Sequence, residues 1–188
     1  MKSYHFLKDD MTAGSGTEKA WTIGETRTYQ GEIALCKTGY HSSPSWYDAL
    51  SYAPGNMACI VSVSKPVEKD DTKMVSATRT LIDARDAEFP LREFACDCTE
   101  RALKKAKVKD ERSWNAIKVS RAYNRGEATK DQLSAAYWAA HSAADSAAHS
   151  AARSAADTAA HTAAHTAEVR WQKRRLNWYM TRLFSGES

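Results

Sequence analysis

The first ninety residues consist of short apolar runs separated by turn-forming residues, a pattern that predicts strands. Lys2–Leu7 alternates between apolar and polar residues, as a strand with one buried face does. Met57–Ser64 is short, apolar and rich in β-branched residues, which predicts a central strand of a sheet. Further strands are predicted over Arg27–Gln30 and Glu32–Cys36, and Val75–Asp83 fits either a strand or a short helix.

The pattern changes to helical periodicity after residue 90. Leu91–Val108 places apolar residues at helical spacing, and Asp110–Asn124 is the next predicted helix. Gly126 interrupts this pattern, and Thr129 is suited to cap a third helix that begins near Lys130. The second half is therefore predicted to be all-helical.

The third helical segment contains a four-residue, Ala-rich repeat that begins at Ser134, and no Gly or Pro occurs from there to Phe184. Four residues turn about 400° on an α-helix, so the alanine pair drifts by about 40° in each repeat. A single helix of this length would extend about 80 Å, which favours a break within the repeat. We therefore predict an α+β protein, with a mixed module over 1–90 and a helical domain over 91–188 that holds a long Ala-rich helix or a helical hairpin.

Charge is divided unevenly between the two halves. Residues 1–90 hold 10 Lys and Arg against 12 Asp and Glu, and residues 91–188 hold 17 against 11. The basic excess is typical of a solvated helical surface, and it also suits an acidic partner such as nucleic acid. No secretory leader and no apolar run long enough for a membrane span is evident, and the four cysteines fit a reducing compartment. These features predict a cytoplasmic protein without a membrane partner.

Histidines recur at the fourth position of the repeat. His161 and His165 share a helix face at spacing i, i+4, which suits a metal clamp, but no local carboxylate completes a ligand set. The same repeat position also holds Asp145, Arg153 and Asp157, which indicates a position that accepts any polar residue. We therefore predict no metal and no cofactor.

The end of the last helix mixes basic and aromatic residues. This mixture suits contacts with phosphates and stacked bases, and it equally suits an amphipathic helix that packs its aromatic side chains. The candidate partner-binding residues of this segment are Trp171, Lys173, Arg174, Arg175 and Trp178.

The most specific local stretch is Cys36–Gly55, in which a glycine turn precedes His41, two serines and a predicted helix over Ser45–Tyr52. Backbone N–H groups at such a helix start suit an anion, and Ser-Pro at this place is also an ordinary capping arrangement. A nucleophilic serine would need a base and an orienting acid, and the sequence assembles no complete set.

This stretch resembles a family of small proteins common in tailed-phage and prophage genomes, and the resemblance covers most of residues 1–85. It implies no particular catalytic residue. The matching pattern comprises Trp21/Gly24, Cys36/Gly39/Tyr40/His41/Ser43, Asp48–Gly55 and Asp70–Lys73.

The second half is similar to helical immunity proteins, on the strength of Phe94–Cys98 and Arg121–Glu127. That resemblance implies neutralisation of another protein by binding. A further likeness is to ADP-ribosyltransferase-like folds, in which His5, Tyr40 and His41 would line a nicotinamide pocket, although the sequence offers no match for the catalytic glutamate of that fold.

Together these features favour binding over catalysis. The leading hypothesis is a phage or prophage accessory protein that binds a host or competing-phage protein, or a nucleoprotein complex, and inhibits a host defence system. Such a protein would act in the cytoplasm of the bacterial host. The alternatives are an NAD-using enzyme with His5, Tyr40 and His41 as catalytic candidates, and a structural protein that forms homo-oligomers through its Ala-rich helices.

Overall fold

A computed structural model describes residues 1–15, 17–151 and 158–187, and it describes side chains outside 141–165. The chain forms two compact units. The first comprises Met1–Glu88 together with Lys173–Ser188, and the second comprises Phe89–Gln172. The fold is α+β, as predicted, with antiparallel sheets followed by helices.

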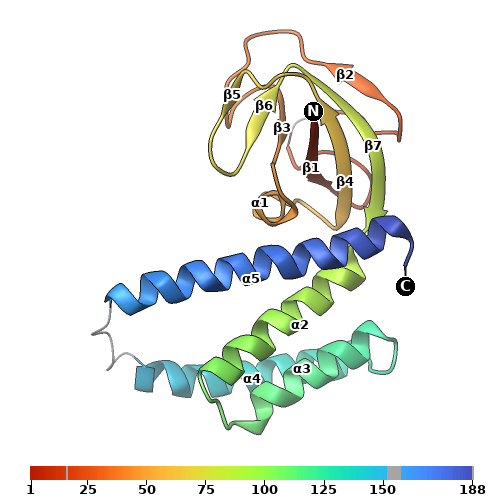
Figure 1. Cartoon of the computed structure of the whole chain (residues 1–188). Coiled ribbons are helices and arrows are strands. Elements are labelled where there is room, and N and C mark those ends of the chain that lie inside the picture. The colour runs from red at the N-terminus through yellow and green to blue at the C-terminus, as the bar shows by residue number, and fades with distance from the viewer. Residues whose placement is uncertain (16, 152–157, 188) are drawn as a thin grey trace. The chain divides into compact units, whose positions relative to one another are not determined.

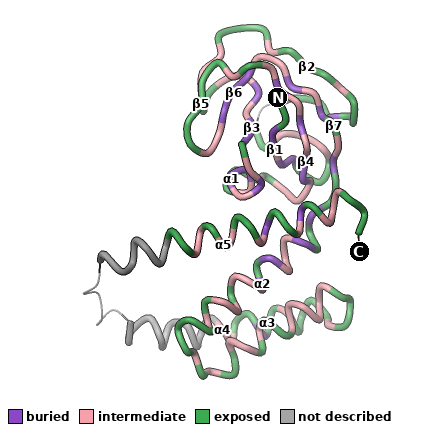
Figure 2. The backbone as a smooth tube through the Cα atoms, viewed as in Figure 1, coloured by how far each residue is buried: buried purple, intermediate pink, exposed green. Residues whose placement is uncertain are grey.

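The larger sheet of the first unit has the strand order β1-β4-β7-β2, and every neighbouring pair is antiparallel (Figure 1). The central position of β4 confirms the prediction made from the apolar, β-branched sequence of that strand. Buried residues recur along β4 and the first part of β7 (Figure 2), and they alternate with partly exposed residues over Cys59–Val63 and Thr78–Leu81. The strands are β1 (Lys2–Leu7), β2 (Thr26–Thr28), β4 (Met57–Val63) and β7 (Thr78–Asp86).

A smaller antiparallel sheet has the order β3-β6-β5, with β3 over Tyr40–Ser42, β6 over Met74–Ser76 and β5 over Glu68–Lys69. The segment that fitted either strand or helix is thus strand, divided between β6 and β7. The strand predicted over Glu32–Cys36 is wrong. Cys36 has a φ of 66°, and the Leu35 N–H donates to the Glu68 carboxylate at 2.7 Å, so this segment is a turn.

Helix α1 (Trp46–Leu50) follows β3, and Ser45 is its N-cap. The Asp48 N–H donates to the Ser45 hydroxyl at 3.2 Å, which satisfies one of the free amides at the helix start. Trp46 is buried, and its ring contacts Phe6 of β1 edge-on. The short helix is therefore held on the sheet by an aromatic contact.

The second unit is helical, as predicted, and its helices begin and end close to the predicted positions. Asp110 caps α3, and the Gln132 N–H donates to the Thr129 hydroxyl at 3.2 Å at the start of α4. The predicted interruption at Gly126 is confirmed by its φ of 76°. The helices are α2 (Glu88–Lys105), α3 (Glu111–Asn124), α4 (Lys130–Ala151) and α5 (Thr158–Ser185), the last of which ends in the first unit.

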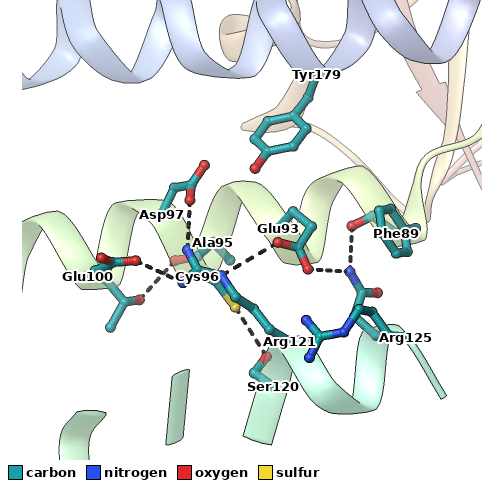
Figure 3. A network of polar contacts seen from close by, with 12 residues as sticks. Phe89, Glu93, Ala95, Cys96, Asp97, Glu100, Ser120, Arg121, Arg125 and Tyr179 are labelled. Carbon is teal, nitrogen blue, oxygen red and sulfur yellow. Dashed lines mark hydrogen bonds and ion pairs between the residues drawn. The ribbon is translucent and has the colours of Figure 1, made fainter. Parts of the chain in front are cut away.

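An ion-pair network joins α2 and α3 (Figure 3). The Arg121 guanidinium lies 2.8 Å from Asp97, 2.8 Å from Glu100 and 3.5 Å from Glu93. Because the three carboxylates lie one turn apart along α2, a single planar guanidinium bridges them. The network fixes how α3 lies against α2.

The repeat histidines His141, His149, His161 and His165 lie outside the residues whose side chains are described. Within the described part of the chain, no group of three or more His, Cys, Asp and Glu side chains is placed to hold a metal ion. None of the described helices combines the length and apolar character that a membrane crossing requires.

Candidate functional site

The first unit contains a cavity of about 520 Å³. Strands β1, β3 and β7 and the loop before Trp21 all contribute to its lining. His5, Tyr40 and His41, which the sequence analysis singled out as catalytic candidates, all line it. The cavity is thus the place where the predicted residues of this unit come together.

The pairing of β1 with the start of the Ser-Pro segment brings these residues together. The Tyr4 N–H donates to the Ser43 carbonyl at 3.0 Å, and the Ser43 N–H donates to the Tyr4 carbonyl at 2.9 Å. The Ser3 hydroxyl donates to the Ser42 hydroxyl at 2.9 Å within the same contact. This bridge sets His5 of β1 close to His41 of β3.

Arg79 of β7 lies on the cavity wall and is 3% exposed. Its Nη1 donates to the His41 carbonyl at 3.1 Å, and its guanidinium lies 4.4 Å from the Trp21 ring and 5.0 Å from the Tyr40 ring. Burial lowers the pKa of Arg79 to about 10, which still leaves the group charged at neutral pH. A full positive charge is therefore held at the wall of the cavity.

His5 is enclosed and uncharged at neutral pH. Its Nε2 atom is buried and has no hydrogen-bond partner among the described residues. Burial, and then the Arg79 and His41 charges, lower the pKa of His5 well below 6.5. A neutral imidazole with an unpartnered nitrogen offers one donor or one acceptor to a ligand.

His41 has a structural task. Its Nε2 accepts the Cys36 N–H at 2.9 Å, and it is also hydrogen-bonded to the backbone of Gly39. Burial lowers the pKa of His41, which matches an acceptor nitrogen that must stay unprotonated. The ring therefore holds the turn before β3, and it is less suited than His5 to proton transfer.

Tyr40 is buried against Trp21 and Tyr29, with ring centroids 5.5 and 6.4 Å away. Burial, and then the Glu18 carboxylate, raise the pKa of Tyr40, so its hydroxyl stays protonated at neutral pH. Among the described lining residues Glu18 is the one carboxylate. The cavity is therefore aromatic and cationic, and no hydroxyl of the described lining is paired with a histidine base in the manner of a nucleophilic serine.

The basic and aromatic segment of α5 serves partly to hold the first unit together. The Lys173 ammonium lies 3.0 Å from the buried Asp48 carboxylate of α1. The Phe184 ring stacks on Trp46 with centroids 5.3 Å apart and an interplanar angle of 21°. Lys173, proposed for partner binding, thus already has a carboxylate partner.

Trp178 lies in the same segment of α5 and is 44% exposed. The Arg175 and Arg182 guanidinium groups lie 4.5 and 4.9 Å from its ring. Arg174 is exposed beside them. We call Arg174, Arg175, Trp178 and Arg182 the cationic-aromatic patch. Trp171 lies in the second unit, where its ring contacts the Arg101 guanidinium at 4.6 Å.

Sequence reasoning missed Arg79, Lys73 and Glu18 as cavity residues. One signal was present for Arg79. Arg79 lies on the inward face of β7 with Leu81, so it is a charged residue at a position where the alternation of the strand predicts a buried apolar residue. Glu18 and Lys73 lie in turn-rich segments, where no periodicity places a side chain.

Two family models match the chain. Residues 84–187 match the family described as Imm-5 like putative immunity protein, and residues 1–92 match a domain of unknown function, DUF7666. No curated protein and no solved structure matches the chain.

Proposed function

The chain belongs to the family of Imm-5 like putative immunity proteins, and from that membership we propose that it acts by binding and inhibiting another protein. The family match over residues 84–187, more than half of the chain, is the observation that carries the proposal. Inhibition by binding requires no assembled catalytic group.

The finer proposal is a phage or prophage accessory protein that blocks a host defence system or a competing phage in the bacterial cytoplasm. The phage-like motifs between Trp21 and Lys73 support this origin. Because residues 91–188 carry a basic excess, the target is proposed to present an acidic surface, as a protein or as a nucleoprotein complex.

The cationic-aromatic patch is the proposed contact surface for the partner. Exposed Trp and Arg side chains carry a disproportionate share of binding energy in protein interfaces. The patch combines one such Trp with three Arg side chains within the segment that the family model covers. The sequence also suggested Lys173 and Trp171; Lys173 is proposed to support the fold of the first unit, and Trp171 that of the second.

The test is affinity purification of the tagged chain from its bacterial host, followed by reconstitution of the complex from purified components. We expect one partner at a fixed stoichiometry whose activity falls when the chain is added. A double variant, Arg174→Glu with Trp178→Ala, should weaken the complex by at least about tenfold. Trp138→Ala on α4, where Trp138 is 64% exposed, is the matched control for loss of an exposed Trp. A chain that purifies without any such partner would contradict the proposal.

A second candidate function is an NAD-using ADP-ribosyltransferase. One observation favours it: His5, Tyr40 and His41 line a single cavity together with the carboxylate of Glu18. Incubation with labelled NAD and host lysate tests it, with Glu18→Gln as the inactive control. Absence of label on any protein would remove this candidate and would leave the inhibitor proposal intact.

A further inference from the structure

We propose that the cavity of the first unit binds a small phosphorylated ligand with a planar ring, of which a nucleoside monophosphate is the simplest example. Its phosphate would lie against Arg79 and Lys73, and its ring against the tyrosines of the lining. This inference concerns binding alone, and it depends on neither of the functions proposed above.

The charge of the lining points to an anion. Lys37, Lys73 and Arg79 line the cavity, and Glu18 is the one carboxylate among the described lining residues. Both lining histidines are neutral at pH 7, since burial lowers the pKa of His5 and of His41. The cavity therefore has a positive excess, which a phosphate would neutralise.

Arg79 is the strongest single argument, because a buried guanidinium is costly unless a counter-charge accompanies it. No carboxylate of the described residues lies within ion-pair distance of Arg79. Glu18, the acidic group with the largest effect on its pKa, instead lies 3.8 Å from Arg27. A guanidinium has five N–H donors, and the described residues give Arg79 one hydrogen bond, to the His41 carbonyl. Its remaining donors suit a phosphate.

His5 provides a second and independent observation. Its Nε2 atom is buried without a partner among the described residues, although burying an unsatisfied polar nitrogen costs free energy that most folds avoid. His5 and Arg79 are close enough for the charge of Arg79 to lower the pKa of His5. An unsatisfied nitrogen beside an unpaired guanidinium is the arrangement expected of a polar ligand site.

Lys73 completes the phosphate side. The charges of Lys73 and Arg79 both act on His41 and lower its pKa, so the two cations lie near the same imidazole ring. The Lys73 ammonium lies 4.7 Å from the Tyr52 ring, and both side chains line the cavity. Lys73 comes from the segment just before β6 and Arg79 from β7, so the two cations can contact a phosphate from more than one side.

The aromatic lining points to the planar group. Tyr4, Tyr29, Tyr40 and Tyr52 all line the cavity, and Tyr52 is 49% exposed. Stacking of a base on an aromatic side chain tolerates any base, which suits a nucleoside. The volume of about 520 Å³ lies within the range of small-ligand and cofactor sites. A bare phosphate would leave this aromatic wall unused.

The test is isothermal titration calorimetry of the full chain with AMP, adenosine and inorganic phosphate as separate probes. We expect AMP to bind at one site, and adenosine and phosphate each to bind at least about tenfold more weakly. Arg79→Gln and, separately, Lys73→Gln should weaken AMP binding by about 10–100-fold, since each removes charge-assisted hydrogen bonds. Arg85→Gln, an exposed position on the same strand as Arg79, is the matched control and should bind AMP as the parent does.

Lys73→Gln keeps the test decisive if Arg79→Gln fails to fold, because Lys73 is partly exposed whereas Arg79 is buried. AMP that fails to bind at millimolar concentration would overturn the inference, as would equal affinities for AMP and inorganic phosphate. Unchanged AMP affinity in Lys73→Gln would do the same. None of these outcomes bears on whether the chain binds a protein partner.

Discussion

His5 stays neutral in the folded chain, because burial lowers its pKa well below the value of 6.5 that is ordinary for a histidine. When the pH falls below about 6.5, the unfolded chain takes up a proton at this position and the folded chain does not. The free energy of unfolding should therefore fall with decreasing pH, by up to about 1.4 kcal/mol per pH unit from His5.

Urea unfolding at a series of pH values between 7.5 and 5 measures this slope. His41, whose pKa is also lowered, adds a smaller contribution of the same sign. The variant His5→Gln should show a shallower slope over the same interval. A parent and a variant with identical slopes would show that His5 is protonated in the folded state.

Gly39 is required by its backbone and by its neighbours. Its φ is 98°, and a Cβ at this position would lie 2.7 Å from Cγ2 of the buried Val75. We expect Gly39→Ala to lower the free energy of unfolding by more than about 2 kcal/mol, through backbone strain and overpacking together. Gly126→Ala is the control, since Gly126 has a positive φ of 76° and nothing within 4 Å of an added Cβ. Its cost should be about 1 kcal/mol, measured in the same denaturant series.

At the scale of elements, the contact between α2 and α3 depends on Arg121. Removing this side chain leaves Glu93, Asp97 and Glu100 without the cation that bridges them. Arg121→Ala should therefore destabilise the second unit by about 1–2 kcal/mol, seen as a lower Tm by circular dichroism. Arg112→Ala removes an exposed pair with Asp110 and should leave the Tm nearly unchanged. Equal effects of the two variants would mean that the network adds nothing beyond surface pairing.

Most elements could be predicted from the sequence because their signals are local. The alternation of β1, the β-branched run of β4 and the start of α1 are each signalled within a short run of consecutive residues. The prediction for Glu32–Cys36 was wrong because a left-handed residue and a bond from Leu35 to a distant Glu68 hold it as a turn. Interactions that join distant residues leave no periodic trace.

The cavity residues also divide into those with a local signal in the sequence and those that only tertiary pairing brings together. His5, Tyr40 and His41 were named from the sequence, and they do line one cavity. The bridge between Tyr4 and Ser43 that brings them together, and the approach of Arg79 from β7, arise from pairing between segments distant in the sequence. Composition could suggest the residue types, but the tertiary pairing decides which of them share a space.

At the scale of the whole molecule, the two matched families do not coincide with the two compact units. The immunity-protein match runs to residue 187, whereas Lys173–Ser188 belongs to the same unit as Met1–Glu88. Within that unit Phe184 stacks on the buried Trp46, and Lys173 pairs with the buried Asp48. The N-terminal unit therefore depends on the last part of the chain for two contacts to α1.

A chain ending at Gln172 should consequently have a less stable N-terminal unit, because Asp48 loses its counter-charge and Trp46 loses its stacked ring. We expect a red shift of tryptophan emission and a lower midpoint of urea unfolding. In the full chain, Phe184→Ala should reproduce part of the loss, about 1–3 kcal/mol, whereas Trp178→Ala on the exposed side of the same helix should not. If the truncated chain unfolds at the parent midpoint, the N-terminal unit does not need residues 173–188 for its stability. If its midpoint is lower, AMP binding and partner binding must both be measured on the full chain. The terminal segment then supports α1 beside the cavity, and the same segment carries the cationic-aromatic patch.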